Sequence, residues 1–115
     1  MLFKKMNMEN IKKPNLIEVS IINGVRYRYL NFDISFKDEM YVWEQIEIPS
    51  GKYNYGGITD CLIQYKYPID KMQAVINNYL LDPEDAYAID EFNKMQAWRK
   101  EAKEISKEAL LYELS

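Results

Sequence analysis

The stretch Asn15-Leu-Ile-Glu-Val-Ser-Ile-Ile-Asn-Gly-Val-Arg-Tyr-Arg-Tyr-Leu30 sets β-branched and aromatic residues on both sides of Asn23-Gly24. This dipeptide tolerates the positive φ angles of a type I′ turn, so the stretch predicts a β-hairpin with a two-residue loop. The register of such a hairpin pairs Ile22 with Val25, Ile21 with Arg26, Val19 with Arg28 and Ile17 with Leu30.

Two further strand segments follow the hairpin. Apolar residues alternate with polar ones from Leu30 to Phe36, which extends the second strand to about residue 36. Residues 37–39 predict a turn, and Met40–Ile48 predicts a third strand that Pro49 and Gly51 end. Before the hairpin, residues 1–13 are rich in lysine, show no strand alternation and stop at Pro14, so we expect a flexible basic arm there.

The second half of the chain predicts helices. Residues 52–57 combine two glycines with Tyr53 and Tyr55, which is typical of a mobile loop that binds through aromatic side chains. Residues 59–66 have helical spacing with Thr59 as N-cap, although a strand is the alternative because Ile63, Tyr65 and Tyr67 also alternate. A second helix is expected from Asp70 to about Leu81, with an apolar face made of Met72, Val75, Ile76 and Tyr79 or Leu80.

A long helix is expected from Pro83 to about Leu114, because Asp82-Pro83-Glu84-Asp85 is a typical helix start and neither Gly nor Pro occurs between residues 84 and 114. Heptad spacing within it defines a helix seam. We predict that this seam is a partner interface formed by Met95, Trp98, Ala102, Ile105, Ala109 and Tyr112, together with the loop residues Tyr53 and Tyr55. The alternative, slightly favoured over packing on another helix, is that the seam packs on the chain's own sheet, although a rod of this length outruns a three-stranded sheet whose strands span about 20 Å.

These segments predict an α+β fold with an N-terminal antiparallel β-hairpin, a third strand, short helices and a long C-terminal amphipathic helix. At 115 residues, the chain has the size of one domain, which we place at residues 14–115. It contains neither a long apolar run nor a signal-peptide pattern, so we expect no membrane partner. Its single cysteine, Cys61, is expected in the core of a protein from a reducing compartment.

The sequence argues against catalysis. It contains no histidine, which removes the commonest general base near neutral pH and the commonest metal ligand. The acidic cluster Asp82, Glu84, Asp85, Asp90 and Glu91 could hold Mg²⁺, but acids at a helix start are more simply explained by the helix dipole. We therefore expect no enzymatic activity, no metal and no cofactor.

Nucleic acid is not the expected partner either. The net charge is −3, whereas general nucleic-acid binders carry a basic excess. A single-stranded nucleic-acid site would rest on Arg26 and Arg28, but strand alternation puts these arginines and the neighbouring Tyr27 and Tyr29 on opposite faces.

Two segments of the C-terminal half carry a resemblance. They are Leu62-Ile-Gln-Tyr-Lys-Tyr-Pro-Ile-Asp-Lys-Met-Gln-Ala-Val-Ile-Asn-Asn-Tyr-Leu80 and Glu91-Phe-Asn-Lys-Met-Gln-Ala-Trp-Arg-Lys-Glu-Ala-Lys103. Together, within residues 60–108, they resemble small uncharacterised proteins of tailed bacteriophages and prophages of gut bacteria. The resemblance implies a protein of the bacterial host cytoplasm or of the phage particle.

The expected function is therefore that of a non-enzymatic phage or prophage interaction protein. Such a small structural or adaptor subunit would self-associate or dock on a larger phage or host protein through the helix seam and its aromatic surfaces. An inhibitor of a host enzyme or defence factor is the first alternative, and a single-stranded nucleic-acid-binding module is the second.

Overall fold

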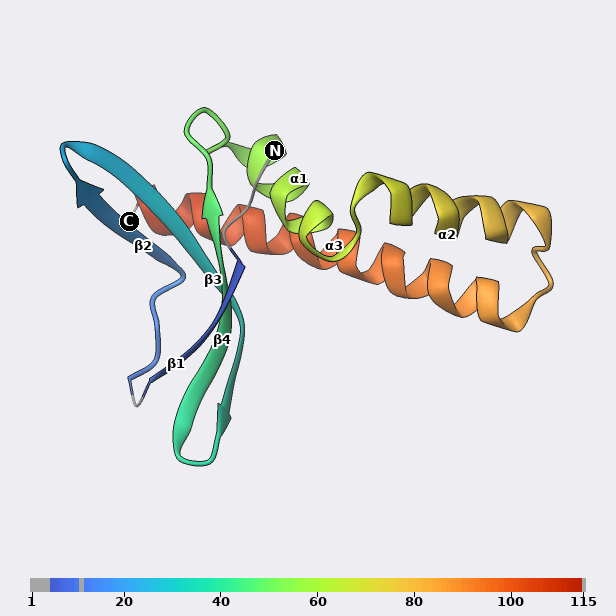
Figure 1. Cartoon of the computed structure of the whole chain (residues 1–115), viewed down its shortest axis with the longest axis horizontal. Coiled ribbons are helices and arrows are strands. Elements are labelled where there is room, and N and C mark those ends of the chain that lie inside the picture. The colour runs from blue at the N-terminus through green and yellow to red at the C-terminus, as the bar shows by residue number, and fades with distance from the viewer. Residues whose placement is uncertain (1–4, 11, 115) are drawn as a thin grey trace.

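In the part of the chain that the structure describes, four strands come first and three helices follow (Figure 1). The computed structural model describes residues 5–10 and 12–114, and it describes residues 5–10 and 112–114 by their backbone alone. The elements are β1 (Lys5–Asn10), β2 (Ile17–Ile22), β3 (Val25–Lys37), β4 (Met40–Ile48), α1 (Tyr55–Lys66), α2 (Ile69–Leu81) and α3 (Ala86–Leu114). The predicted α+β class is confirmed.

The β2–β3 hairpin has the predicted turn and register. Asn23 and Gly24 form its two-residue loop with φ angles of 54° and 79°, as a type I′ turn requires. Ile22 pairs with Val25, and the ladder continues to Ile17 opposite Leu30. The prediction of this hairpin is correct because both of its signals, the turn dipeptide and the alternation, are local.

The sheet continues through β4 to β1, in the order β1-β4-β3-β2 with every neighbouring pair antiparallel. The ladder between β3 and β4 shifts register between Phe32 and Ser35, where Asp33 adopts a positive φ of 51°. The prediction of a flexible arm over residues 1–13 is wrong for Lys5–Asn10, which forms a strand along β4. Residues 1–4 and 11 lie outside the described residues.

One face of the sheet packs against α1 and α3 to form the core. Fully buried side chains from the sheet and both helices meet there, namely Leu30, Ile46, Ile58, Cys61, Leu62, Met95, Ala102 and Ala109. The alternation along β3 and β4 explains the strand contribution, because every second residue of these strands points to the helices.

The opposite face of the sheet carries a buried polar cluster. The Asn31 side chain accepts hydrogen bonds from Trp43 Nε1 (3.0 Å) and Gln45 Nε2 (2.9 Å), and its Nδ2 donates to the carbonyl oxygen of Asn15 (2.7 Å). Asn31, Trp43 and Gln45 are all buried. These bonds attach the segment before β2 to the centre of the sheet and satisfy polar groups that would be costly to bury unpaired.

The helices begin at residues other than those predicted. Residues 59–66 are helical, but α1 starts at Tyr55, because the side chain of Asn54 caps it by accepting a 2.8 Å hydrogen bond from the backbone N–H of Gly57. Thr59 is therefore not its N-cap. Pro68, and not Asp70, precedes α2 as its N-cap residue, and Asp70 lies in the first turn. The long helix α3 begins at Ala86 instead of Pro83, because residues 82–85 form the link from α2.

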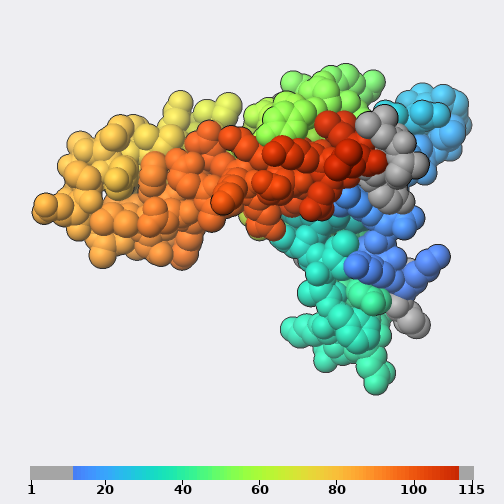
Figure 2. All heavy atoms as spheres, turned by 180° about the vertical axis from the view of Figure 1, so that it is seen from behind, coloured from blue at the N-terminus to red at the C-terminus, as the bar shows by residue number. Residues whose placement is uncertain are grey.

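The helices α2 and α3 form an antiparallel pair that extends away from the sheet (Figure 1). Tyr79 and Phe92 stack between them with their ring centroids 4.3 Å apart, and Val75 and Ala88 are buried. Figure 2 shows this pair as a projection separate from the β3–β4 hairpin. The whole molecule measures 51 × 37 × 24 Å.

Candidate functional site

The helix seam predicted as a partner interface lies inside the chain's own core. Met95, Trp98, Ala102 and Ala109 are buried, and Ile105 is partly buried against the same cluster. The side chain of Tyr112 lies outside the described residues. The seam therefore packs α3 onto α1 and the sheet, and its four buried side chains are not available to a partner in this structure.

Small side chains let α1 and α3 come close, and a short polar chain joins them. Thr59 Oγ1 donates a 2.8 Å hydrogen bond to Ser106 Oγ, which in turn donates a 2.8 Å bond to the carbonyl oxygen of Ala102. Thr59 and Ser106 are both buried. Because each hydroxyl has a partner, the pair can lie in the core without a large desolvation penalty.

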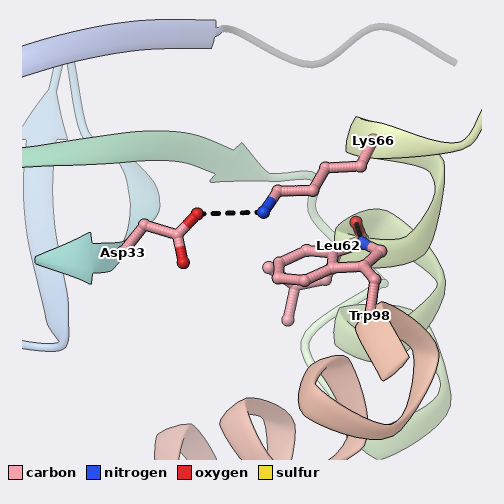
Figure 3. Close-up of polar contacts among 4 residues, drawn as sticks. All are labelled: Asp33, Leu62, Lys66 and Trp98. Carbon is pink, nitrogen blue, oxygen red and sulfur yellow. Dashed lines mark hydrogen bonds and ion pairs between the residues drawn. The ribbon is translucent and has the colours of Figure 1, made fainter. Parts of the chain in front are cut away.

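A polar junction joins β3, α1 and α3, and Figure 3 shows its four residues. Trp98 of α3 donates its indole N–H to the carbonyl oxygen of Leu62 over 2.8 Å. The ammonium of Lys66 lies 3.9 Å from the centroid of the Trp98 ring and 3.1 Å from Asp33 Oδ2. The bulge at Asp33 directs this carboxylate toward the helices. An indole face and a carboxylate thus hold one cation between sheet and helices.

An open depression of about 310 Å³ adjoins this junction, lined by Glu44, Tyr65, Lys66, Tyr67 and Lys71. Burial raises the pKa of the Tyr65 hydroxyl, and a hydrogen bond to Glu44 and the charges of Glu44 and Asp33 raise it further. Tyr65 therefore keeps its proton at neutral pH. The ammonium of Lys71 lies 4.8 Å from the centroid of the Tyr67 ring. The depression thus shares Lys66 with the junction.

The structure brings two other predicted site residues together. The guanidinium of Arg28 lies 4.4 Å from the centroid of the Tyr53 ring, and Tyr53 is partly buried against the core. Arg26, by contrast, is exposed on β3, and Tyr55 is exposed at the start of α1. The predicted aromatic loop over 52–57 is thus shorter than expected, because residues 55–57 form the first turn of α1.

A surface whose acidic residues the sequence singled out, but not its apolar ones, lies at the far end of the α2–α3 pair, over residues 80–87, which we call the tip. Leu80, Leu81 and Tyr87 are 69%, 85% and 70% exposed. The tip also carries Asp82, Glu84 and Asp85, which belong to the acidic cluster found in the sequence, and all three are exposed. Asp82 Oδ1 accepts from the backbone N–H of Glu84 (3.3 Å) and Asp85 Oδ1 from that of Tyr87 (3.2 Å). The sequence did contain a signal for this apolar surface, because Leu80 and Leu81 directly precede Asp82-Pro83, where a helix end and a new helix start were predicted.

The thiol of Cys61 keeps its proton at neutral pH. Cys61 is fully buried, and burial, followed by the nearby charge of Asp60, raises the pKa of its thiol to about 11. In the part of the chain that the structure describes, no three carboxylate or thiol side chains are placed to hold a metal ion. Over the same residues, no helix combines the length and apolar character that crossing a bilayer requires.

The fold is thus a mixed α+β domain with an antiparallel sheet, a helical layer and a projecting helix pair. Comparison with protein families, with curated proteins and with solved structures finds no match for this chain.

Proposed function

We propose that this chain is a non-enzymatic interaction protein of a phage or prophage, and that it binds a protein partner through the α2–α3 tip. The observation that carries the proposal is the exposure of three large apolar side chains, Leu80, Leu81 and Tyr87, at the end of a projecting helix pair. The origin and the role as a small structural or adaptor subunit rest on the resemblance of residues 60–108 to phage and prophage proteins.

The tip has the chemistry of a small protein-binding surface. Burial of one large apolar side chain contributes about 1.5–3 kcal/mol, from which the entropic cost of association must be subtracted. Asp82, Glu84 and Asp85 lie between them in the chain. The complementary partner surface is an apolar pocket with basic side chains at its rim.

The helix pair presents this surface in a fixed arrangement. The stacked rings of Tyr79 and Phe92 and the buried Val75 and Ala88 hold the two helices together behind the tip. Asp82 accepts a hydrogen bond from the backbone N–H of Glu84 in the link, and Asp85 accepts one from that of Tyr87 in the first turn of α3. A surface that is ordered before binding loses less conformational entropy on association.

The test compares two leucine-to-serine variants. Leu80→Ser with Leu81→Ser removes apolar area from the tip, while Leu111→Ser is the matched control, since Leu111 is 66% exposed on α3 but outside the tip. Each tagged protein is used to capture partners from bacterial lysate, and a protein captured in stoichiometric amount is purified and titrated by calorimetry. The tip variant should lose at least about tenfold in affinity, whereas the control should bind as the wild type does.

Two results would count against the proposal: equal binding of the tip variant and the wild type, or equal loss in both variants. Binding should also weaken as salt rises, because the acids of the tip would face basic side chains. The inhibitor alternative would use the acidic helix face around Asp82 to Glu91, which overlaps the tip. It is distinguished by the partner, since an inhibitor forms a complex with one host enzyme and lowers its activity, whereas an adaptor joins a particle or an assembly.

A further inference from the structure

The strand β2 forms one end of the sheet. Among the strands that the structure describes, β2 pairs with β3 alone, so its other edge has no strand beside it. The strand reads Ile-Glu-Val-Ser-Ile-Ile and includes neither proline nor lysine. Protected edge strands commonly carry such residues, because an open edge is a template for pairing with another chain.

The turn determines which backbone groups face the open edge. In a hairpin with a two-residue loop, the residues that flank the loop form a hydrogen-bonded pair, and hydrogen-bonded pairs then alternate along the ladder. Ile22, Ser20 and Glu18 therefore bond to β3 through their registered partners. The N–H and C=O groups of Ile17, Val19 and Ile21 consequently point away from β3, toward the open edge of the sheet.

The side chains of these three residues are apolar and lie on one face of β2. Ile17 is buried in the core, while Val19 and Ile21 are 49% and 66% exposed. Among the described residues, the open edge thus combines three backbone positions that no other strand pairs with and an apolar row that begins in the core and continues to the exposed Val19 and Ile21.

We propose that β2 pairs antiparallel with β2 of a second copy of this chain, so that Val19 faces Val19 and Ile17 faces Ile21 across a two-fold axis. This register lets all three outward-facing residues of each copy pair with outward-facing residues of the other. It also sets Glu18 opposite Ser20. The pairing joins two four-stranded sheets into one of eight strands.

The neighbouring registers are less favourable. A shift of the partner strand by two residues in one direction sets Glu18 opposite Glu18, and like charges directly opposite each other destabilise a sheet. The same shift in the other direction moves Ile17 opposite Asn23, which belongs to the turn and not to a strand. Val19 therefore lies on the axis. This inference does not depend on the α2–α3 tip, which belongs to different elements.

The experiment measures molar mass by sedimentation on the full chain and on variants at position 19. The wild type should reach twice 13.7 kDa as its concentration rises. Val19→Lys and Val19→Glu should each lower the association constant by about tenfold or more, because each variant sets two like charges opposite one another on the axis. An equal mixture of the two variants should recover the dimer, since opposite charges then meet.

The matched control is Val25→Lys, because Val25 is similarly exposed in the same hairpin but belongs to β3. This variant should dimerise as the wild type does, and circular dichroism should find all variants folded. A wild type that stays monomeric at all concentrations overturns the proposal. So does a dimer that survives Val19→Lys, or a mixture that stays monomeric although its components are folded.

Discussion

Two adjacent glycines at the start of α1 differ sharply in what they allow. A Cβ atom at Gly57 would overlap the backbone carbonyl of Lys52, which belongs to the loop that precedes the helix. A Cβ atom at Gly56 would lie 3.7 Å from Asn54 Oδ1, an ordinary contact. The close approach of the loop to α1 therefore requires glycine at position 57 but not at position 56.

We expect Gly57→Ala to destabilise the protein by several kcal/mol, because the Lys52 carbonyl must move and the Asn54 cap, which bonds to the N–H of Gly57, moves with it. Gly56→Ala should instead stabilise the protein by about 0.5–1 kcal/mol, because alanine loses less backbone entropy in a helix. Urea unfolding of the two variants measures both effects. Similar unfolding midpoints for the two would contradict this account of Gly57.

Single residues were also where the sequence was least informative. Asn31 alternates with apolar neighbours along β3, and this pattern predicts an exposed side chain. Asn31 is nevertheless buried on the face of the sheet opposite the helices. Its partners, Trp43, Gln45 and Asn15, lie 12 to 16 residues away in the chain. Alternation along one strand identifies its two faces but does not reveal that a distant segment covers the polar one.

Strands and helices that depend on local sequence signals were predicted correctly, whereas features that depend on contacts between distant segments were not. The β2–β3 register is determined by four residues around a turn, and the structure confirms it. The strand β1 depends on pairing with β4, which no pattern within residues 1–13 could indicate. The start of α1 depends on Asn54 and on the close contact at Gly57, so it was placed four residues late.

The helix seam is the clearest case of an ambiguous element. Heptad spacing identifies a continuous apolar stripe on a helix but carries no information on what covers it. Here α1 and the sheet cover it, and the Thr59–Ser106 contact fits the close approach of the two helices. The stripe was therefore predicted, and of its two interpretations the buried side chains fit packing within the chain itself.

The burial of the seam can be tested on two adjacent residues of α3. Ala102→Glu puts a carboxylate into a fully buried position and should cost several kcal/mol, so the variant should unfold or aggregate. Lys103→Glu adds the same side chain at an exposed position and should change stability by about 0.5 kcal/mol or less. Thermal unfolding followed by circular dichroism compares them. A folded, stable Ala102→Glu variant would show that the seam is not core.

Across the molecule as a whole, stability should be unequal between the two ends. The helix α1 buries five residues against the sheet and α3, whereas α2 buries Val75. The two helices are similar in length, with 12 and 13 residues. Helices with few buried apolar contacts open locally at a lower free energy than the core.

We therefore expect the amides of α2 to exchange with solvent deuterium at least about tenfold faster than those of α1, because opening α2 exposes less apolar surface. Native-state hydrogen exchange followed by NMR measures both helices in one sample, so α1 serves as the internal control. Equal protection of the two helices would mean that the α2–α3 pair and the sheet open as one unit.

The continuity of α3 gives the molecule a mechanical property. Its 29 residues form one helix that is about 44 Å long, one half of which is packed on the core while the other half carries the tip. A stiff rod that is anchored at one end acts as a lever, so a sideways load on the tip becomes a torque where the rod leaves the core. Trp98, with the ammonium of Lys66 over its ring, lies near the point where the rod leaves the core. With Trp43 replaced by Phe, so that Trp98 is the single indole, its emission should therefore change when the tip is pulled, even though no bound protein touches the ring.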